Sequence, residues 1–323
     1  MKILQVHNYY RYAGGEDQVV RAERNLLRRH GHEVIPYETS SAERPSALLL
    51  AQVVFRSHYS HRARRRFAQA LDVHRPDLVH AHNLFPLMTP SIYDACRQAG
   101  VPVVQTLHNF RMFYPNGLLY HNGRVDLRTL DGSAWPLATE KIYHGSSLLT
   151  AAMVRSIEWH RARDTWNRGV DRFIALTPFA RDLLERFGLD PHRISVKPNF
   201  MSVGGSSMQT GSKPAEKDIG SDSHSLHVEK PSNSRIPADA PPDAYALFAG
   251  RVSPEKGLKP IVSKWTLPEP LMVAGTGPAL ASVRNSASGD IRFLGWIEPD
   301  ELATRMQGAS VLILPSECYE MFP

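Results

Sequence analysis

Residues 249–258 read A-G-R-V-S-P-E-K-G-L and follow a short apolar run that is typical of a buried strand. Gly250 and Gly257 allow a tight turn and a close approach of the backbone to a ligand. Arg251 can bond phosphate oxygens through its guanidinium fork, and Lys256 adds a mobile point charge. A helix that begins near Gly257 would add free N–H groups. The spacing predicts a turn that binds a diphosphate, and the alternative is a surface turn with two solvated cations.

Length and composition limit the kinds of protein that this chain can be. The chain has 323 residues, is 42% hydrophobic and carries a net charge of +6, so it is long enough for two buried domains and mildly basic. Two cysteines, Cys96 and Cys318, are too few for a disulfide framework or a four-thiolate zinc site. The start of the chain has no signal-peptide core, and the longest apolar stretch, Ala47 to Phe55, is too short to span a bilayer. These features predict a cytoplasmic protein.

Short strand and helix patterns alternate along the chain. In the first helical pattern, Glu16 to His30, the side chains Val19, Val20, Glu23, Leu26 and Leu27 recur at helical spacing. Such alternation favours a parallel α/β sheet with helices on both faces. The predicted strands are Ile3–His7, Glu33–Tyr37, Asp77–His82, Val101–Leu107, Asp171–Thr177, Ile194–Val196, Tyr245–Phe248, Leu271–Ala274, Ile291–Gly295 and Val311–Leu314. The later predicted helices are Ser91–Ala99, Ser146–Gly169, Pro178 to Gly188 and Pro299–Gly308.

Two further sets of residues have alternative interpretations. Gly14-Gly15, ahead of the first helix, would suit either a phosphate or a simple tight connection, and the G-x-G-x-x-G dinucleotide fingerprint is absent. Three histidines, His80, His82 and His108, come at the ends of apolar strands. No Glu or Cys joins them at metal-ligand spacing, so the sequence predicts no metal site there. A strand-end histidine is more often a hydrogen-bonded structural residue.

A basic cluster opens another predicted helix. It consists of Arg62, Arg64, Arg65 and Arg66. One interpretation is a helix face exposed to solvent. The alternative is peripheral contact of the protein with the inner, cytoplasmic face of an anionic membrane. Aromatic residues that could stack on bases are not interleaved with the arginines, so nucleic acid is not expected as a partner.

The glycine-rich turn resembles the G-R-x-x-x-E-K-G signature of glycosyltransferase family 4, whose members are retaining enzymes of the GT-B fold. Other segments resemble family motifs in the same order: the strand ending in Thr106-Leu107-His108-Asn109, the segment Phe173–Asn199 that joins the two domains, and the turn Gly275-Thr276-Gly277-Pro278. The resemblance covers almost the whole chain outside residues 202–242. It implies an α/β GT-B architecture, in which two Rossmann-like domains with parallel sheets face each other across a cleft.

The resemblance also implies roles for individual residues. Arg251 and Lys256 would hold the donor diphosphate, with Gly14 and Gly15 near it. His108 would contact a donor-sugar hydroxyl. The donor-binding loops would contain Gly250, Gly257, Gly275 and Gly277. His80 and His82 are expected to be structural.

The resemblance predicts three parts of the chain. Residues 1–200 would be the acceptor-side domain, 201–242 a flexible linker rich in Gly, Ser, Pro, Lys and Asp, and 243–323 the nucleotide-sugar domain. Glu320 resembles the first glutamate of the family's E-x7-E motif, a catalytic residue that contacts the donor sugar, with Met321 in place of the usual glycine. The second glutamate would fall after the last residue. The sequence therefore predicts a C-terminally truncated second domain.

The expected activity is transfer of a hexose from a nucleotide-diphosphate sugar to a glycan or lipid-linked hydroxyl acceptor, with retention at the anomeric carbon. The expected setting is the synthesis of polysaccharide, lipopolysaccharide or another glycoconjugate. No cofactor or metal is expected, because the GT-B fold needs no catalytic metal and the sequence contains no Asp-x-Asp triplet. Two alternatives stay open: a GT-B sugar-nucleotide epimerase, and an inactive remnant that binds a nucleotide sugar. The donor base, sugar, acceptor, linkage and oligomeric state do not follow from the sequence.

Overall fold

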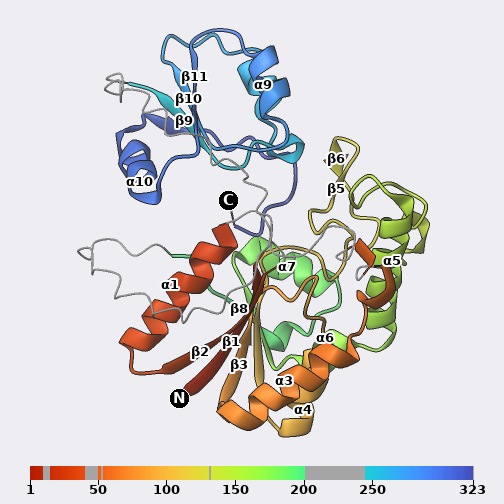
Figure 1. The fold of residues 1–323 in the computed structure, drawn as a ribbon. Helices are drawn as coiled ribbons and strands as arrows, with labels where there is room; N and C mark the ends of the chain where they lie inside the picture. The colour runs from red at the N-terminus through yellow and green to blue at the C-terminus, as the bar shows by residue number, and fades with distance from the viewer. Residues whose placement is uncertain (10–14, 41–49, 52–53, 131, 201–243, 323) are drawn as a thin grey trace, which may run out of the picture. The chain divides into compact units, whose positions relative to one another are not determined.

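The computed structural model describes residues 1–9, 15–40, 50–51, 54–130, 132–200 and 244–322. These residues form two units (Figure 1). The first comprises Met1–Met201 together with Pro254–Gly257 and Pro315–Pro323, and the second comprises residues 244–253 and Leu258–Leu314. The linker predicted at 201–242 lies outside the described residues, so the three-part domain division stays a prediction.

A six-stranded parallel sheet forms the centre of the first unit, with the strand order β2-β1-β3-β4-β7-β8. Its strands are β1 (Lys2–Tyr9), β2 (Glu33–Ser40), β3 (Leu78–Ala81), β4 (Val103–Thr106), β7 (Arg172–Ala175) and β8 (Ile194–Val196). Ile3 of β1 pairs with Val34 on one side and with Leu78 on the other. The six inner residues of β1 are all buried, because helices cover both faces of a parallel sheet.

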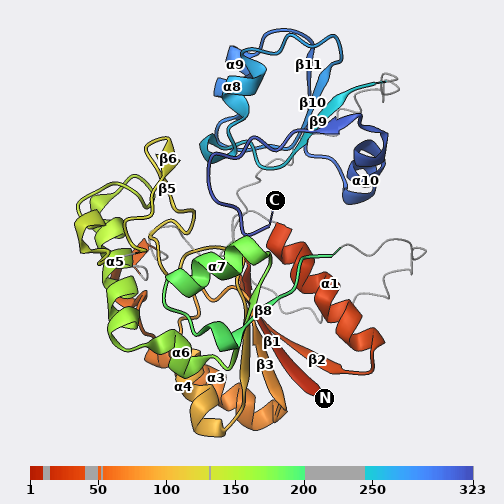
Figure 2. The ribbon, with the colours of Figure 1, turned by 180° about the vertical axis from the view of Figure 1, so that it is seen from behind.

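Helices line the two faces of this sheet. In the two opposite views, α1 lies along one face, and α3 and α4 pack side by side on the other (Figures 1 and 2). The helices of the first unit are α1 (Gly15–Arg29), α3 (His61–His74), α4 (Ser91–Ala99), α5 (Ser147–Ala162), α6 (Thr165–Gly169) and α7 (Pro178–Arg186). Three single 3₁₀ turns span Trp135–Leu137, Pro191–Arg193 and Pro254–Lys256, and a small hairpin joins β5 (Tyr120–His121) to β6 (Arg124–Val125).

Local capping explains where several helices begin and end. The Ser60 hydroxyl accepts a hydrogen bond from the Ala63 N–H at 3.2 Å, which satisfies one of the free donors at the start of α3. Gly100 ends α4 in the left-handed conformation, with φ of 67°. The long helix expected over Ser146–Gly169 is two helices, α5 and α6. Asp164, at φ 48°, breaks it.

A four-stranded parallel sheet forms the centre of the second unit, with the order β11-β10-β9-β12. Its strands are β9 (Ala246–Ala249), β10 (Leu271–Ala274), β11 (Ile291–Gly295) and β12 (Val311–Leu312). Its helices are α8 (Leu258–Val262), α9 (Leu280–Ser286) and α10 (Pro299–Gly308). The residues of β10 are all buried, whereas both residues of β12 are exposed.

Phe67 gives a direct test of the core of the first unit. Its side chain is fully buried on α3 and packs edge-on against Tyr37, with ring centroids 5.0 Å apart. Replacing Phe67 with Ala leaves a cavity and should lower the free energy of unfolding by about 3–5 kcal/mol. The matched change Phe55→Ala, at a phenylalanine that is 72% exposed, should stay within about 0.5 kcal/mol. Urea unfolding measures both, and equal effects would contradict the assigned core.

Candidate functional site

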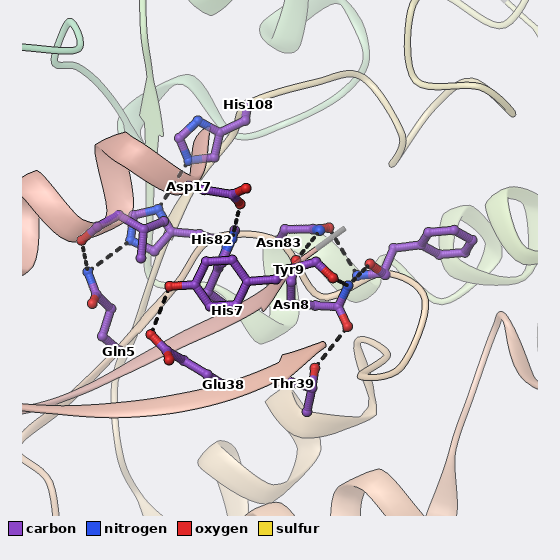
Figure 3. A network of polar contacts seen from close by, with 12 residues as sticks. Gln5, His7, Asn8, Tyr9, Asp17, Glu38, Thr39, His82, Asn83 and His108 are labelled. Carbon is purple, nitrogen blue, oxygen red and sulfur yellow. Dashed lines mark hydrogen bonds and ion pairs between the residues drawn. The ribbon is translucent and has the colours of Figure 1, made fainter. Parts of the chain in front are cut away.

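Polar side chains gather where β1, β3 and β4 end. His7 lies near the end of β1, His82 follows β3 directly, and His108 lies two residues after β4. Because the strands are parallel, their carboxyl ends meet at one edge of the sheet, which is where open α/β sheets bind ligands. The Nδ1 atom of His82 lies 3.1 Å from Nε2 of His108, and the two rings stack (Figure 3). The fold therefore brings the predicted sugar-binding histidine into a network with a histidine predicted to be structural.

Helix α1 supplies Asp17 to this edge of the sheet. The Asp17 carboxylate lies 2.9 Å from Nε2 of His7, and their side chains are 4% and 0% exposed (Figure 3). The His7 ring packs edge-on against Tyr9, whose hydroxyl donates to Glu38 at 3.0 Å. The pair of Asp17 and His7 holds the start of α1 against the end of β1. Neither His7 nor Asp17 belongs to a motif that the sequence reveals.

Glu23 of α1 is the second carboxylate of the network, and its side chain is 5% exposed. Its Oε2 atom lies 3.4 Å from Nε2 of His82 and 3.8 Å from Nε2 of His80, and its Oε1 atom pairs with Lys197. No Glu lies near these histidines at metal-ligand spacing in the sequence, but the fold brings Glu23 of α1 to them from a distant part of the chain. The sequence did contain a signal for this contact. Glu23 shares the helical spacing of the core-facing side chains, and a buried glutamate needs a buried partner.

Two groups of side chains in the described part of the chain have the composition and proximity of metal ligands. They are Glu23 with His80 and His82, and His7 with Glu16 and Asp17. In the first group the carboxylate also binds Lys197, and Nε2 of His80 contacts the Thr106 hydroxyl at 2.9 Å. These contacts suit a hydrogen-bonded network of protein groups.

Burial keeps three of these histidines, His80, His82 and His108, neutral. It lowers the pKa of His82 well below its usual value, and neighbouring histidines lower it further. Burial also lowers the pKa of His80, against the opposing attraction of Glu23. The pKa of His108 falls to about 3, mainly through burial. These three imidazoles therefore offer one N–H donor and one acceptor each near pH 7.

His108 and His82 border a pocket of the first unit that is open to solvent. Gln105, which also lines the pocket, donates to the backbone carbonyl of His82 at 2.5 Å and accepts a hydrogen bond from the Tyr93 hydroxyl. Buried side chains thus fix the backbone around His82. The pocket combines apolar walls with a few oriented polar groups, which is typical of small-molecule sites.

Glycines bring two loops of the second unit into close contact. Gly250 follows β9, and Gly275 and Gly277 follow β10. A Cβ atom at Gly275 would lie 1.9 Å from the Gly250 carbonyl oxygen, and one at Gly277 would lie 2.2 Å from that of Val252. Only glycine fits at either position. The Gly250 N–H donates to Ala274 at 2.9 Å, so the predicted donor loops form one backbone-to-backbone unit.

The structure pairs two further predicted site residues. Lys256 Nζ lies 2.5 Å from the Glu320 carboxylate, which also accepts from the Ser316 hydroxyl at 2.6 Å. Gly257, at φ 63°, makes this approach possible, since a Cβ there would lie 2.1 Å from the Pro315 carbonyl oxygen. The helix after Gly257 has only five residues, so the side chains and backbone of the turn must supply most of any anion binding.

The remaining predicted site residues differ in how they are placed. Arg251 is exposed, Gly15 is the first residue of α1, and Gly14 lies outside the described residues. All four arginines of the basic cluster lie in the first half of α3. Arg62, Arg65 and Arg66 are exposed, and Arg64 donates to Gln98 at 2.8 Å.

Comparison with known proteins identifies the family. The family model described as Glycosyltransferase Family 4 matches residues 13–203, which is more than half of the chain. The chain belongs to glycosyltransferase family 4. The protein is therefore an enzyme of the glycosyltransferase type. No curated protein matches the sequence.

Solved structures agree on the fold. The apo form of the lipopolysaccharide outer core galactosyltransferase WaaB matches with a TM-score of 0.51 and 15% identity, over 100% of this chain and 76% of that one. Anabaena Alr3699/HepE in complex with UDP and glucose matches with a TM-score of 0.54 and 16% identity, over the same shares. The HepE complex with UDP-glucose gives a TM-score of 0.50 and 16% identity, over 98% and 74%. The α/β fold is thus of the GT-B type, as predicted.

None of the helices in the described ranges has the length and apolar character needed to cross a bilayer.

The buried histidines lead us to expect that acid destabilises this protein. His160 is 2% exposed, and burial lowers its pKa from 6.5 to about 3. Below pH 6.5 the unfolded chain binds a proton there that the folded chain does not, so stability is complete above pH 6.5 and is lost as the pH falls towards 3. Each such histidine removes about 1.4 kcal/mol per pH unit in that window.

Urea unfolding between pH 7 and 5 measures this slope. We expect His160→Gln to reduce the slope, and His30→Gln, at an exposed histidine, to leave it unchanged. A stability that does not vary over this range would contradict the neutral state of the buried histidines.

Proposed function

We propose that this glycosyltransferase moves a hexose from a nucleotide-diphosphate sugar to a hydroxyl acceptor, with retention at the anomeric carbon. The observation that carries the proposal is the 2.5 Å pair of Lys256 and Glu320. One is the lysine of the predicted diphosphate turn, and the other is the predicted sugar-contacting glutamate. Their contact supports a single site for the diphosphate and the sugar of a donor.

The proposed chemistry is electrostatic. As the bond to the sugar breaks, negative charge grows on the leaving diphosphate, and Arg251 and Lys256 stabilise it. The tight glycine loops around Gly275 and Gly277 allow backbone N–H groups to approach the phosphates. The acceptor attacks from the face that the diphosphate leaves, and a phosphate oxygen helps to remove the acceptor proton. His108 positions a hydroxyl of the sugar, and no protein group acts as general base.

The donor and acceptor are proposed by class. HepE forms complexes with UDP and with UDP-glucose, so a uridine-diphosphate hexose is the first donor to test. The acceptor would be a glycan or lipid-linked hydroxyl in glycoconjugate synthesis. Exposed Arg62, Arg65 and Arg66 on α3 support peripheral contact with anionic lipid at the cytoplasmic face.

Arg251→Ala tests the diphosphate site. Losing a charge-assisted hydrogen bond to phosphate should weaken UDP binding by about 10- to 100-fold, measured by isothermal titration calorimetry. Lys264→Ala is the matched control, because it removes one positive charge at an exposed position outside the predicted turn and should leave affinity nearly unchanged. Equal affinities for the Arg251 variant and the unmodified protein would remove the diphosphate assignment.

His108→Ala tests sugar positioning. We expect kcat/KM for the donor to fall by about tenfold or more, because one hydrogen bond that orients the sugar is lost. His192→Ala, at an exposed histidine, is the control. Turnover is followed by NMR with and without acceptor, which also reports the anomeric configuration of the product. Unchanged turnover in the variant would leave His108 a structural residue, and conversion of donor without acceptor would indicate an epimerase.

A further inference from the structure

Glu23, His82 and His108 form a line of three side chains that ends at the pocket. The Glu23 carboxylate lies 3.4 Å from Nε2 of His82, and Nδ1 of His82 lies 3.1 Å from Nε2 of His108. Figure 3 shows the two imidazoles meeting nitrogen to nitrogen, with the second ring nitrogen of His108 on the side away from His82. The proposed reaction uses only the last member of this line.

The contact between His82 and His108 carries a single proton, because two ring nitrogens 3.1 Å apart have room for one hydrogen between them. Two arrangements are possible. Either His82 carries its hydrogen on Nε2, facing Glu23, and accepts from His108, or it carries the hydrogen on Nδ1 and donates to His108. The two arrangements give His108 opposite tautomers, and so opposite hydrogen-bonding character at the pocket.

The competing partner of His82 is Gln5. Its amide nitrogen lies 3.5 Å from Nε2 of His82, and would favour an acceptor there. The same nitrogen already donates to the Val20 carbonyl at 3.1 Å, and the Gln5 carbonyl oxygen accepts from Arg24 at 2.7 Å. Gln5 therefore keeps a bond from each end of its amide, whichever tautomer His82 adopts.

The Glu23 carboxylate decides between the arrangements. Its Oε2 atom is buried and has no hydrogen-bond partner within the described residues. His80 is the farther imidazole at 3.8 Å, and its Nε2 already contacts Thr106. Leaving a buried anionic oxygen without a donor costs more free energy than leaving a neutral amide hydrogen weakly bonded. Hydrogen bonds to ionised groups are also about twice as strong as those between neutral groups. The hydrogen of His82 is therefore favoured on Nε2.

We infer that Glu23 and His82 are positioning residues that hold His108 in the tautomer protonated on Nε2, so that its Nδ1 presents a bare acceptor. In that tautomer His108 accepts a hydrogen bond from a hydroxyl of the ligand. The identity of that ligand as a sugar rests on the proposed function, whereas the tautomer itself does not.

Lys197 makes Glu23→Gln a sharp test of this assignment. The ammonium of Lys197 contacts Oε1 of Glu23 and needs an acceptor there. In the glutamine variant the amide oxygen stays with Lys197, and the NH₂ group then faces Nε2 of His82. His82 must accept at Nε2 and donate from Nδ1, which moves the proton of His108 to Nδ1. The shape of the side chain is unchanged.

The experiment is ¹⁵N NMR of the full chain with labelled histidine, with the His108 signals assigned by their loss in His108→Gln. We expect His108 to be protonated on Nε2 in the unmodified protein and on Nδ1 in Glu23→Gln. Glu33→Gln, at a glutamate that is 61% exposed, is the matched control and should keep the first pattern. If transfer is confirmed, Glu23→Gln should lower kcat/KM for the donor about tenfold.

The outcomes separate the two claims. A proton on Nδ1 of His108 in the unmodified protein overturns the inference, even if Glu23→Gln fails to fold. An unchanged His108 tautomer in a folded Glu23→Gln variant also overturns it. Histidine signals that shift when a chelator is added would show a metal ion on Glu23, His80 and His82, and would replace the hydrogen-bonded line. The expected tautomers in a protein without transferase activity would refute the proposed function and leave the positioning role intact.

Discussion

The buried charge of Glu23 is the constraint on which the sheet edge depends. An isolated carboxylate in an apolar interior is strongly disfavoured, so Glu23 needs partners that stay in place. Lys197, after β8, and His82, after β3, provide them. Glu23 therefore links α1 to the ends of β3 and β8. These two strands are distant in sequence from α1 and from each other. Such a buried pair adds little net stability, but losing one partner is costly, which favours a single arrangement.

Backbone sterics impose the corresponding constraint in the second unit. The carbonyl oxygens of Gly250 and Val252 occupy the space that side chains at Gly275 and Gly277 would need. Two loops from adjacent parallel strands can then lie against each other with their backbones in contact. This backbone packing holds the start of the turn that precedes Lys256. The turn is consequently rigid where a diphosphate would require close backbone approach.

Local patterns predicted the strands of the two parallel sheets, most helices and the glycine loops, because hydrophobic periodicity and turn chemistry are local, whereas the short hairpin of β5 and β6 was missed. The break at Asp164 was missed, since a left-handed non-glycine residue leaves no periodic signal. Glu23 was counted as a helix-face position, but its partners His82 and Lys197 are distant in sequence, so spacing rules for metal ligands could not find them. The family resemblance gave Lys256 and Glu320 separate roles, and their contact was not predicted, because no pattern within one segment links residues 64 positions apart.

The two halves of the proposed site use different chemistry for a physical reason. A leaving diphosphate carries full negative charge, which lysine and arginine stabilise best. A sugar hydroxyl is neutral, so a neutral hydrogen-bonding group is enough to orient it. Burial lowers the pKa of His108 to about 3 and so keeps its imidazole neutral. A neutral imidazole still has two possible tautomers, and the hydrogen bond at its other ring nitrogen selects one. In the proposed arrangement that selection comes from Glu23 through His82, with Lys197 on the side of Glu23 away from His82.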